Sequence, residues 1–319
     1  MKVSRIIEAL GIGPDEVSGD QNRVIRGAAA LAEARQGNLT FCKRDREPRL
    51  AELKDCTIII PWTMNRKNLS KENTYLLTGH PRLLFIRALE LLYPEIFQPG
   101  ADKLARIHPS ARIDPSARIG PFVQIGPGCV IKKNATIHSH VSILLNTTIA
   151  ENVLIFPGTV IGSDGFGYER DAKKKLRKFI HLKGVVIGKN VEIGANTCID
   201  RGSLTDTEIG ESTKIDNLVH IAHNVKIGKH CEIIAHAMIG GSARIGDYTR
   251  VAPGAQIMNG IKIGRNVTIG MGAVVTRDVG DNLVMAGNPA REMREFKKYL
   301  EYIKAKTSRP KKVNKSEPK

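Results

Sequence analysis

The sequence of 319 residues has few aromatic side chains, 5% in all with a single Trp, and only five cysteines. The cysteines are odd in number and widely spaced, with no CxxC pair: Cys42, Cys56, Cys129, Cys198 and Cys231. This pattern fits neither a disulfide framework nor a zinc site, so we expect reduced thiols. No apolar run reaches the roughly 18 residues needed to span a bilayer, and no signal-peptide pattern opens the chain. The sequence therefore predicts a soluble cytoplasmic protein without a transmembrane segment.

Acidic residues are outnumbered, because 49 Lys and Arg stand against 32 Asp and Glu and give a net charge of +17. Such an excess favours acidic partners: nucleic acid, anionic membranes, phosphate-bearing substrates or acidic carrier proteins. The tail after Lys304 is rich in Lys, Pro and Ser, and we expect it to be disordered. It carries no recognition motif, so no nucleic-acid partner is predicted.

What the chain does contain is glycine, at 30 residues, and an aliphatic residue at every sixth position. Twenty-five positions follow this period, in runs over 107–161, 187–199 and 209–275. A period of six is neither the 3.6 of a helix nor the alternation of a single strand. It predicts a parallel β-helix, with three hexads in each coil, about eight coils and about 4.8 Å between coils. The aliphatic residues point inward, and glycines such as Gly120 suit the corners.

Two insertions interrupt the period. Residues 162–184 form a basic stretch that includes Phe166 and Tyr168, and residues 200–208 are four residues longer than a hexad requires. Solenoids accommodate insertions as loops on one face, often the binding face, so we expect both near a site. The alternative is that they are tolerated surface loops.

The segments on either side of the solenoid lack the six-residue period. Residues 1–100 combine a short helix over 3–10, a strand over 56–61 and a helix over 81–92, which predicts a small α/β domain. The solenoid domain is then expected over 101–285.

Residues 286–319 are predicted to form an amphipathic helix and a basic tail. Within 291–304, Met293, Phe296, Leu300 and Ile303 fall on one helical face. This face would cap the solenoid or pack in an oligomer.

Among nine histidines, His223 has the most informative setting. It lies two places after the inward Ile221, at a corner. The equivalent places are Arg201 one coil earlier and Gly241 and Asn259 in later coils. The near-neutral pKa of a histidine side chain suits it to take a proton from an amine that attacks an acyl carbonyl. Asp216 is our candidate for the carboxylate that orients the ring.

Four segments make the predicted function more specific: 160–168 (VIGSDGFGY), 198–203 (CIDRGS), 206–210 (DTEIG) and 215–225 (IDNLVHIAHNV). They resemble the UDP-3-O-acylglucosamine N-acyltransferases of lipid A biosynthesis, a branch of the hexapeptide-repeat acyltransferase family. The similarity covers about two-thirds of the chain, and its DGFGY and IAHN motifs are specific to this branch.

The resemblance implies a left-handed β-helix and a homotrimer that transfers a 3-hydroxyacyl group from acyl carrier protein to the 2-amino group of a UDP-linked amino sugar. No cofactor is implied beyond the phosphopantetheine that carries the acyl donor, and no metal. His223 would be the general base, and the Gly241 N–H would donate to the oxyanion. The residues expected to bind substrate are Phe41, Asp164, Phe166, Tyr168, His220, Asn224 and Asn259.

Three departures from the family pattern leave alternatives open. No second histidine accompanies Asn259, since none occurs between residues 237 and 319, and Phe41 is followed at the uracil-binding offsets by Arg44 and Glu47 instead of Asn and Tyr. The segment 286–291 (AGNPAR) is similar to a signature of acetyl-CoA-dependent hexapeptide enzymes. An acetyl-CoA-dependent N-acetyltransferase acting on another nucleotide-linked amino sugar is therefore the main alternative.

A further alternative is a non-catalytic assembly protein or a metal-dependent carbonic anhydrase of the same solenoid class. A metal site would need three converging histidines. The pairs His138/His140 and His220/His223 are about four to five coils apart, too far to share an ion.

Overall fold

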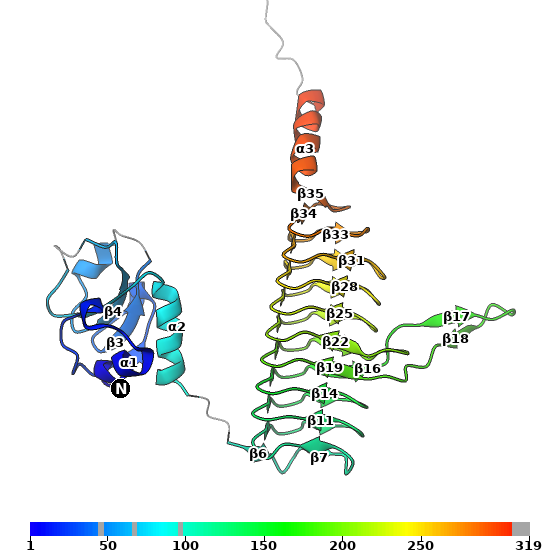
Figure 1. The fold of residues 1–319 in the computed structure, drawn as a ribbon, viewed down its shortest axis with the longest axis horizontal. Helices are drawn as coiled ribbons and strands as arrows, with labels where there is room; N and C mark the ends of the chain where they lie inside the picture. Colours follow the sequence, from blue (N-terminus) through cyan, green and yellow to red (C-terminus); the bar gives the residue numbers. More distant parts are fainter. Residues whose placement is uncertain (44–47, 66–68, 95–97, 308–319) are drawn as a thin grey trace, which may run out of the picture. The chain divides into compact units, whose positions relative to one another are not determined.

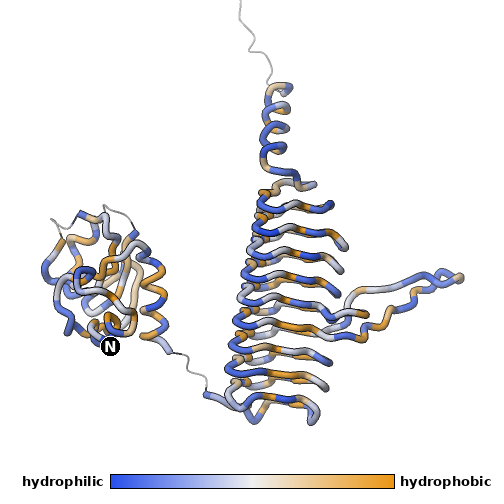
Figure 2. The backbone as a smooth tube through the Cα atoms, in the orientation of Figure 1, coloured by the Kyte–Doolittle hydropathy of each residue, from blue (hydrophilic) through white to orange (hydrophobic). Residues whose placement is uncertain are grey.

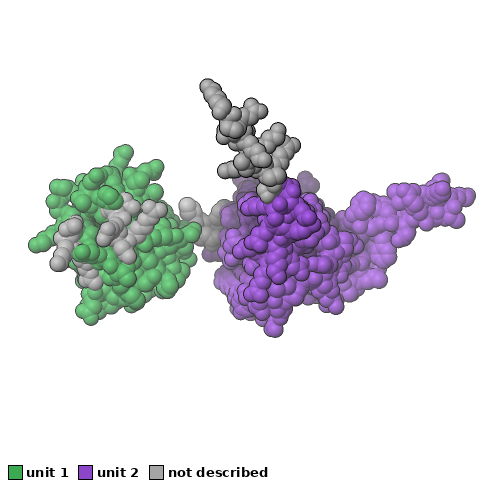
Figure 3. Space-filling model, turned by 90° about the horizontal axis from the view of Figure 1, so that it is seen from above, with its two compact units in different colours: residues 1–96 green, residues 97–319 purple. Residues whose placement is uncertain are grey.

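The computed structural model describes residues 1–43, 48–65, 69–94 and 98–307. The chain forms two compact units, residues 1–96 and residues 97–319 (Figure 3). Within the described part of the chain, no helix is long and apolar enough to cross a membrane.

The first unit is a five-stranded sheet in the order β1-β5-β4-β3-β2, with β1 antiparallel to β5 and the other pairs parallel. Its strands are β1 (Val17–Ser18), β2 (Gly27–Ala28), β3 (Asn38–Phe41), β4 (Thr57–Pro61) and β5 (Thr74–Thr78). Its helices are α1 (Val3–Leu10), α2 (Pro81–Leu92) and the 3₁₀ turns η1 (Pro14–Glu16), η2 (Leu31–Glu33) and η3 (Pro48–Ala51).

Alternation along the strands gives this sheet two apolar faces. On one face Leu39, Ile59 and Leu76 pack with Ile6 of α1 and Leu84 of α2. The other face is covered by loops, and its cluster is a separate one that contains Cys56, Ile58, Ile60, Tyr75 and Leu77. Phe41 belongs to the helix-covered face, where its ring lies 4.8 Å from that of Phe85.

The second unit is a parallel β-solenoid built of three sheets whose strands run one above another (Figure 1). The nine-stranded sheet consists of β7 (Arg106–Ile107), β10 (Gln124–Ile125), β13 (Ser142–Ile143), β16 (Val160–Ser163), β21 (Cys198–Asp200), β24 (His220–Ile221), β27 (Met238–Ile239), β30 (Gln256–Ile257) and β33 (Val274–Val275).

The eight-stranded sheet consists of β8 (Arg112–Ile113), β11 (Val130–Ile131), β14 (Thr148–Ile149), β19 (Val185–Ile187), β22 (Thr207–Ile209), β25 (Lys226–Ile227), β28 (Arg244–Ile245) and β31 (Lys262–Ile263). The eleven-stranded sheet consists of β6 (Gly100–Ala101), β9 (Arg118–Ile119), β12 (Thr136–Ile137), β15 (Leu154–Ile155), β20 (Glu192–Ile193), β23 (Lys214–Ile215), β26 (Glu232–Ile233), β29 (Arg250–Val251), β32 (Thr268–Ile269), β34 (Val284–Ala286) and β35 (Arg291–Glu292).

The six-residue period is the register of these sheets. Each inward aliphatic residue pairs with the one in the next coil, as Ile125 does with Ile143 and Ile143 with Ile161. Together they form one continuous buried cluster along the solenoid. Figure 2 shows the result as apolar and polar segments that alternate along the coils. The predicted parallel β-helix of hexapeptide repeats, with a small α/β unit before it and a helix after it, is confirmed.

Both insertions leave the inward ladder in step, although the register shifts after Ile161, where Ser163 pairs with Asp200. Ile161 pairs with Ile199 across the first, and Ile199 with Ile221 across the second. The first contains a hairpin, β17 (Tyr168–Arg170) and β18 (Leu176–Lys178), which projects from the solenoid with every strand residue exposed (Figure 1).

The last element that the structure describes is α3 (Met293–Thr307), whose first turns meet the last coil. Arg291 lies 4.8 Å from the ring of Tyr299, and Phe296 lies against Gly287. Further along, Leu300 and Ile303 of the predicted apolar face are exposed. The helix therefore packs on the solenoid only near its start.

Candidate functional site

His223 lies at a corner of the solenoid, just after β24. The pairing of Ile199, Ile221, Ile239 and Ile257 places one residue of each coil in the same column. The column contains Arg201, His223, Gly241 and Asn259, as the repeat predicted. A Cβ atom on Gly241 would lie 2.9 Å from both Cε1 and Nε2 of His223. The Nε2 edge of the ring thus lies over a glycine, which has no side chain to cover it.

The two insertions meet at this corner. Leu182 N–H donates to the Ser203 carbonyl over 2.9 Å, and Gly202 N–H donates to the Gly184 carbonyl over 3.1 Å. Asp206 also accepts a hydrogen bond from the Gly184 N–H, at 2.8 Å. Both insertions therefore lie beside His223, as the sequence predicted, and together they form one wall there.

The first insertion brings a second histidine to His223. The rings of His181 and His223 are 5.2 Å apart at 69°, and His181 is only 2% exposed. Gly165 lies against both rings, because a Cβ there would be 2.7 Å from His223 Cβ and Cδ2 and 2.9 Å from His181 Nε2. The sequence did not distinguish His181 from the other histidines. Its place in an insertion beside the His223 corner was the only signal.

The surroundings of His181 favour its neutral form. Burial lowers the pKa of His181, and the neighbouring His223 lowers it further, while Asp164 and a hydrogen bond with the Phe179 backbone oppose the change.

Asn224 links His223 to the second insertion. Its amide oxygen accepts from Ser203 N–H at 2.7 Å and from Ser203 Oγ at 3.1 Å. Its amide nitrogen lies 2.9 Å from Ser203 Oγ and 3.2 Å from Nδ1 of His223. The backbone N–H of Asn224 donates to Thr207 Oγ1 at 2.9 Å. Asn224 was predicted to bind substrate, but its side chain is engaged inside the protein.

The carboxylate at this corner is Asp200, and Asp216 lies elsewhere. Asp216 follows β23 of the eleven-stranded sheet, at a different corner, and accepts from Asn217 N–H at 2.8 Å and Ala235 N–H at 3.2 Å. The prediction that Asp216 orients His223 within one chain is therefore not supported. Asp216 and His223 belong to successive hexads, and each hexad turns onto a new corner.

Asp200 is 6% exposed and accepts a hydrogen bond from Ser163 Oγ at 2.9 Å. Its Oδ2 lies 3.8 Å from Nε2 of His220. Burial raises the pKa of Asp200, and the hydrogen bond from Ser163 and the charges of His220, His223 and His181 oppose that rise. Asp200 is thus a buried carboxylate that three imidazoles can stabilise. The predicted substrate-binding residue His220 is its exposed neighbour.

The remaining predicted binding residues divide between the insertion and the column. Asp164 forms ion pairs with Lys178 and Arg201. The hydrogen bond from Lys178 lowers the pKa of Asp164, and Arg201 adds to the effect. Phe166 is 84% exposed and lies edge-on to Tyr168, with 5.1 Å between ring centroids.

Asn259 is exposed two coils beyond His223. Asp164, Phe166, Tyr168, His220 and Asn259 thus belong to the same unit as His223, on its corner, on the adjoining strand or in the insertion.

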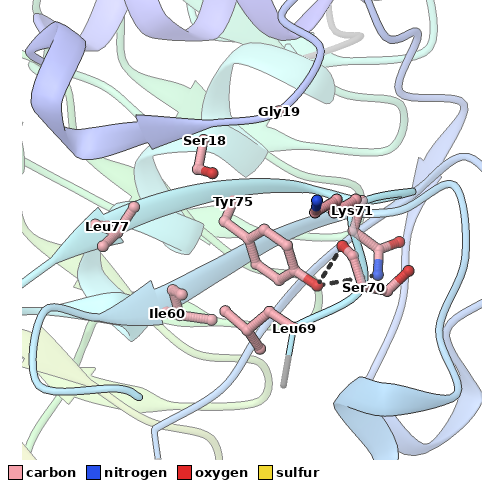
Figure 4. Close-up of a pocket in the computed structure, with 9 residues that line it drawn as sticks. Ser18, Gly19, Ile60, Leu69, Ser70, Lys71, Tyr75 and Leu77 are labelled. Atoms are coloured by element: carbon pink, nitrogen blue, oxygen red, sulfur yellow. Dashed lines mark hydrogen bonds between the residues drawn. The ribbon is translucent and has the colours of Figure 1, made fainter. Parts of the chain in front are cut away.

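Phe41 belongs to the first unit, and positions 44 and 47 lie outside the described residues. That unit contains a pocket of about 460 Å³, lined by residues that include Ser18, Ser70 and Tyr75 (Figure 4). The Tyr75 hydroxyl donates to the Ser70 carbonyl at 3.2 Å on one side of this pocket. Because Tyr75 and Phe41 belong to opposite faces of the sheet, this pocket is not the Phe41 surface.

Across the described ranges, no three His, Cys, Asp or Glu side chains are grouped so that they could hold a metal ion.

Comparisons with known proteins concern the solenoid as a whole. The family model "Bacterial transferase hexapeptide (six repeats)" matches residues 206–241 and 242–277, and the model "GMPPB C-terminal domain" matches residues 102–165. A curated relative, UDP-3-O-acylglucosamine N-acyltransferase of Acinetobacter baylyi, is 32% identical over 194 residues. The match covers 55% of this chain and 54% of the relative, so the chain spans about half the length of that protein.

Solved structures of acyltransferases share the solenoid. UDP-N-acetylglucosamine acyltransferase of Francisella novicida matches with a TM-score of 0.56 at 29% identity, over 64% of this chain and 79% of that one. The enzyme of the same name from Bacteroides fragilis matches with a TM-score of 0.55 at 28% identity, over 60% and 73%. The curated relative confirms the resemblance to the UDP-3-O-acylglucosamine N-acyltransferases, and residues 206–277 of the solenoid match the model of bacterial transferase hexapeptide repeats.

Proposed function

We propose that this protein is an N-acyltransferase that moves a 3-hydroxyacyl group from acyl carrier protein to the 2-amino group of a UDP-linked 3-O-acylglucosamine. The observation that carries the proposal is the His223 corner. A half-buried histidine stands over Gly241, between a buried carboxylate and the wall formed by the two insertions. The curated relative named for this reaction and the solenoid acyltransferases support the same class of chemistry.

The reaction would take place at the exposed edge of His223. An amine attacks the thioester carbonyl and a C–N bond forms, the carbonyl oxygen becomes an oxyanion, and His223 as general base takes the proton that the amine loses. The C–S bond then breaks, and the thiolate leaves with that proton as the thiol. Among the described residues nothing accepts a hydrogen bond from the Gly241 N–H, so this amide is free to donate to that oxyanion. Asp200 would supply a negative charge that stabilises a protonated imidazole at this corner.

A homotrimer is proposed from the charges on the solenoid surface. From Ser142 to Val274, the residue before each inward aliphatic residue of the nine-stranded sheet is uncharged: Ser142, Val160, Cys198, His220, Met238, Gln256 and Val274. Asp200, at the end of β21, is buried beside His220. The outward residues of the other two sheets include Glu208, Lys226, Glu232 and Arg250. An uncharged face is the one that can be buried against a second copy at the least desolvation cost.

Cyclic symmetry about this face would bring its two edges together. One edge carries His223. The other carries a groove of about 560 Å³ lined by residues that include Phe156, Asp216 and Ile234. Asp216 and His223 lie in the same coil, so in a trimer with parallel axes they would lie at nearly the same height on neighbouring copies. This arrangement would complete a site that a single chain leaves open.

Sedimentation equilibrium tests the assembly. We expect a trimer for the natural protein, and a shift towards monomer for Met238→Glu, which places a charge in the middle of the uncharged face. Lys226→Glu on the eight-stranded sheet is the matched control and should leave the mass unchanged. A monomeric natural protein would refute the proposed trimer.

Acyl carrier protein is proposed as the donor because this chain is strongly basic and acyl carrier proteins are acidic. A second candidate remains, an acetyl-CoA-dependent N-acetyltransferase, and the sequence of residues 286–291 favours it. In the fold this segment joins the end of β34 to the start of β35, and its Arg291 lies against Tyr299 of α3.

Turnover with paired donors decides between the two. Purified protein is given the UDP-linked amino sugar with either 3-hydroxyacyl carrier protein or acetyl-CoA, and the N-acylated sugar is measured by mass spectrometry. We expect product with the carrier protein, and loss of that product for His223→Gln with an unchanged melting curve. Product from acetyl-CoA alone would replace the first proposal by the second, and no product from either donor would refute both.

A further inference from the structure

The hairpin of the first insertion stands in solvent with both of its sides open. Its strands β17 and β18 form three cross-strand pairs whose six residues are all exposed: Tyr168 with Lys178, Glu169 with Arg177 and Arg170 with Leu176. A two-stranded ribbon of this kind is marginally stable at best in water unless a further strand or another surface packs on it. The hairpin therefore needs a surface to lie on.

The exposed surface of this insertion is both apolar and basic. Its large apolar side chains have exposed fractions between 42% and 84%: Phe166, Tyr168, Leu176, Phe179, Ile180 and Leu182. An exposed apolar surface of this kind marks a site of contact with another molecule. The turn of the hairpin adds three successive exposed lysines, at positions 173–175. A partner that offers an apolar recess and negative charge would match this surface.

The hairpin leaves the solenoid at the corner that carries His223. β16 of the nine-stranded sheet precedes it, β19 of the eight-stranded sheet follows it, and the hairpin points away from the coils (Figure 1). This corner is one edge of the uncharged face proposed to join the three copies. In that assembly the hairpin would extend beyond its own chain, onto the copy whose groove meets the same edge.

The groove at the other edge of the uncharged face has the matching chemistry. Three carboxylates line it, those of Glu192, Asp216 and Glu232, together with the ammonium group of Lys214. Phe156 in the same groove is 37% exposed and offers an apolar surface. Because β16, β19 and β20 follow one another in a single coil, Glu192 of a neighbouring copy with a parallel axis would lie at nearly the height at which the hairpin leaves.

We propose that the hairpin of one copy packs into the groove of the neighbouring copy, where Phe166 and Tyr168 cover Phe156 and basic side chains lie among the carboxylates. The inference rests on the trimer proposed above and adds residues from a second copy to the site. His223 and the hairpin come from one copy, and Asp216 and the groove come from its neighbour. The apolar side chains of the hairpin are exposed because a single chain lacks that neighbour.

Tryptophan fluorescence tests the contact without substrate. Trp62 is the single Trp of the chain, so Trp62→Phe provides a background free of natural signal. Phe166→Trp in this background places an indole where the side chain is 84% exposed in one chain. We expect the trimer to emit at shorter wavelength and to resist acrylamide quenching, and the added change Met238→Glu to abolish both effects. Tyr248→Trp is the matched control, because Tyr248 is 62% exposed at the corner between β28 and β29, away from the uncharged face, and it should be quenched equally in both states.

The other occupants of the hairpin surface give different results. Free quenching of the indole in the trimer would overturn the inference. Protection that persists in the Met238→Glu monomer would place the cover within the chain and overturn it too. Protection that appears only when phosphatidylglycerol vesicles are added would make the hairpin a membrane contact, and the inference would again fail.

Cross-linking identifies the partner surface. Cys198 is the exposed cysteine and the other four are buried, so Cys198→Ser removes the reactive natural thiol. In this background, copies with Phe166→Cys are co-expressed with copies with Phe156→Cys, and the mixed trimers are treated with a short bis-maleimide. We expect covalent dimers, which can form only between two copies. Tyr248→Cys in place of Phe156→Cys should give none, and mixed trimers without covalent dimers would overturn the inference.

These results separate the contact from the chemistry. A trimer with a covered hairpin that transfers no acyl group would refute the proposed function and leave the contact standing. A trimer that transfers acyl groups while its hairpin stays exposed would refute the contact and leave the proposed function standing.

Discussion

Gly165→Ala tests whether the first insertion really packs on the reacting histidine. The added methyl group would lie 2.7 Å from Cβ and Cδ2 of His223 and 2.9 Å from Nε2 of His181, whereas ordinary contact begins at about 3.4 Å. The shortfall is about 0.7 Å at His223 Cβ. This atom is next to the backbone and cannot swing away, so either the insertion or the coil must move.

We expect Gly165→Ala to lower both the stability of the fold and the rate of acyl transfer. Overpacking of this kind destabilises by about 1–3 kcal/mol. Displacement of a reacting group by about 1 Å can cost on the order of 10²-fold in rate, so we expect kcat/KM to fall by about 10- to 100-fold. Thermal melting measures the first effect, and the acyl-transfer assay measures the second.

Two other glycines provide graded controls. A methyl group on Gly167, in the same insertion, would lie 3.3 Å from Phe179 Cβ and 3.6 Å from His181 Cε1, so a smaller effect is expected. On Gly280, far along the solenoid, it would meet only Leu283 at 3.8 Å, and no effect is expected. If Gly165→Ala melts and turns over like the natural protein, the insertion does not hold His223 and the reasoning fails.

Two further predictions concern buried groups of the solenoid. Burial raises the pKa of Asp200 above its unfolded value, so the ionised carboxylate lowers stability at every pH above the raised pKa, and this penalty disappears as the pH falls towards about 4. Asp200→Asn should therefore melt higher than the natural protein at pH 7 but not at pH 4, and an equal gain at both would contradict the assignment. Ile221→Ala should lower the free energy of unfolding in urea by about 2–5 kcal/mol, because Ile221 is fully buried, whereas Ile107→Ala, at an exposed end of the ladder, should cost much less.

Much of the solenoid could be predicted from the sequence because its order is local and repeated. A strand of two residues and a corner recur every six positions, so the inward position of Ile221 fixes that of Ile239 and Ile257 in the next coils. The same counting placed His223, Gly241 and Asn259 in one column. Each coil packs its inward aliphatic residues only against those of the coils above and below it, so the register of the strands follows from the six-residue spacing alone.

The contents of the site beyond that column depended on tertiary structure. The six-residue period says nothing about the path of an insertion. Counting hexads therefore could not predict the contact of His181 with His223 or the wall formed by the two insertions. Asp216 was chosen because it is near in sequence, but each hexad turns onto a new corner and separates it from His223. Asp200 comes close from the coil below.

The surroundings of Asn224 are the clearest case. The IAHN segment drew attention to His223 and Asn224 together, but only the fold brings Ser203 from the second insertion to the Asn224 amide. The sequence thus determined the coils and the corner, because hydrophobic burial repeats with the chain. The tertiary structure decided which side chains surround His223, because hydrogen bonds between segments distant in the chain have no period to reveal them.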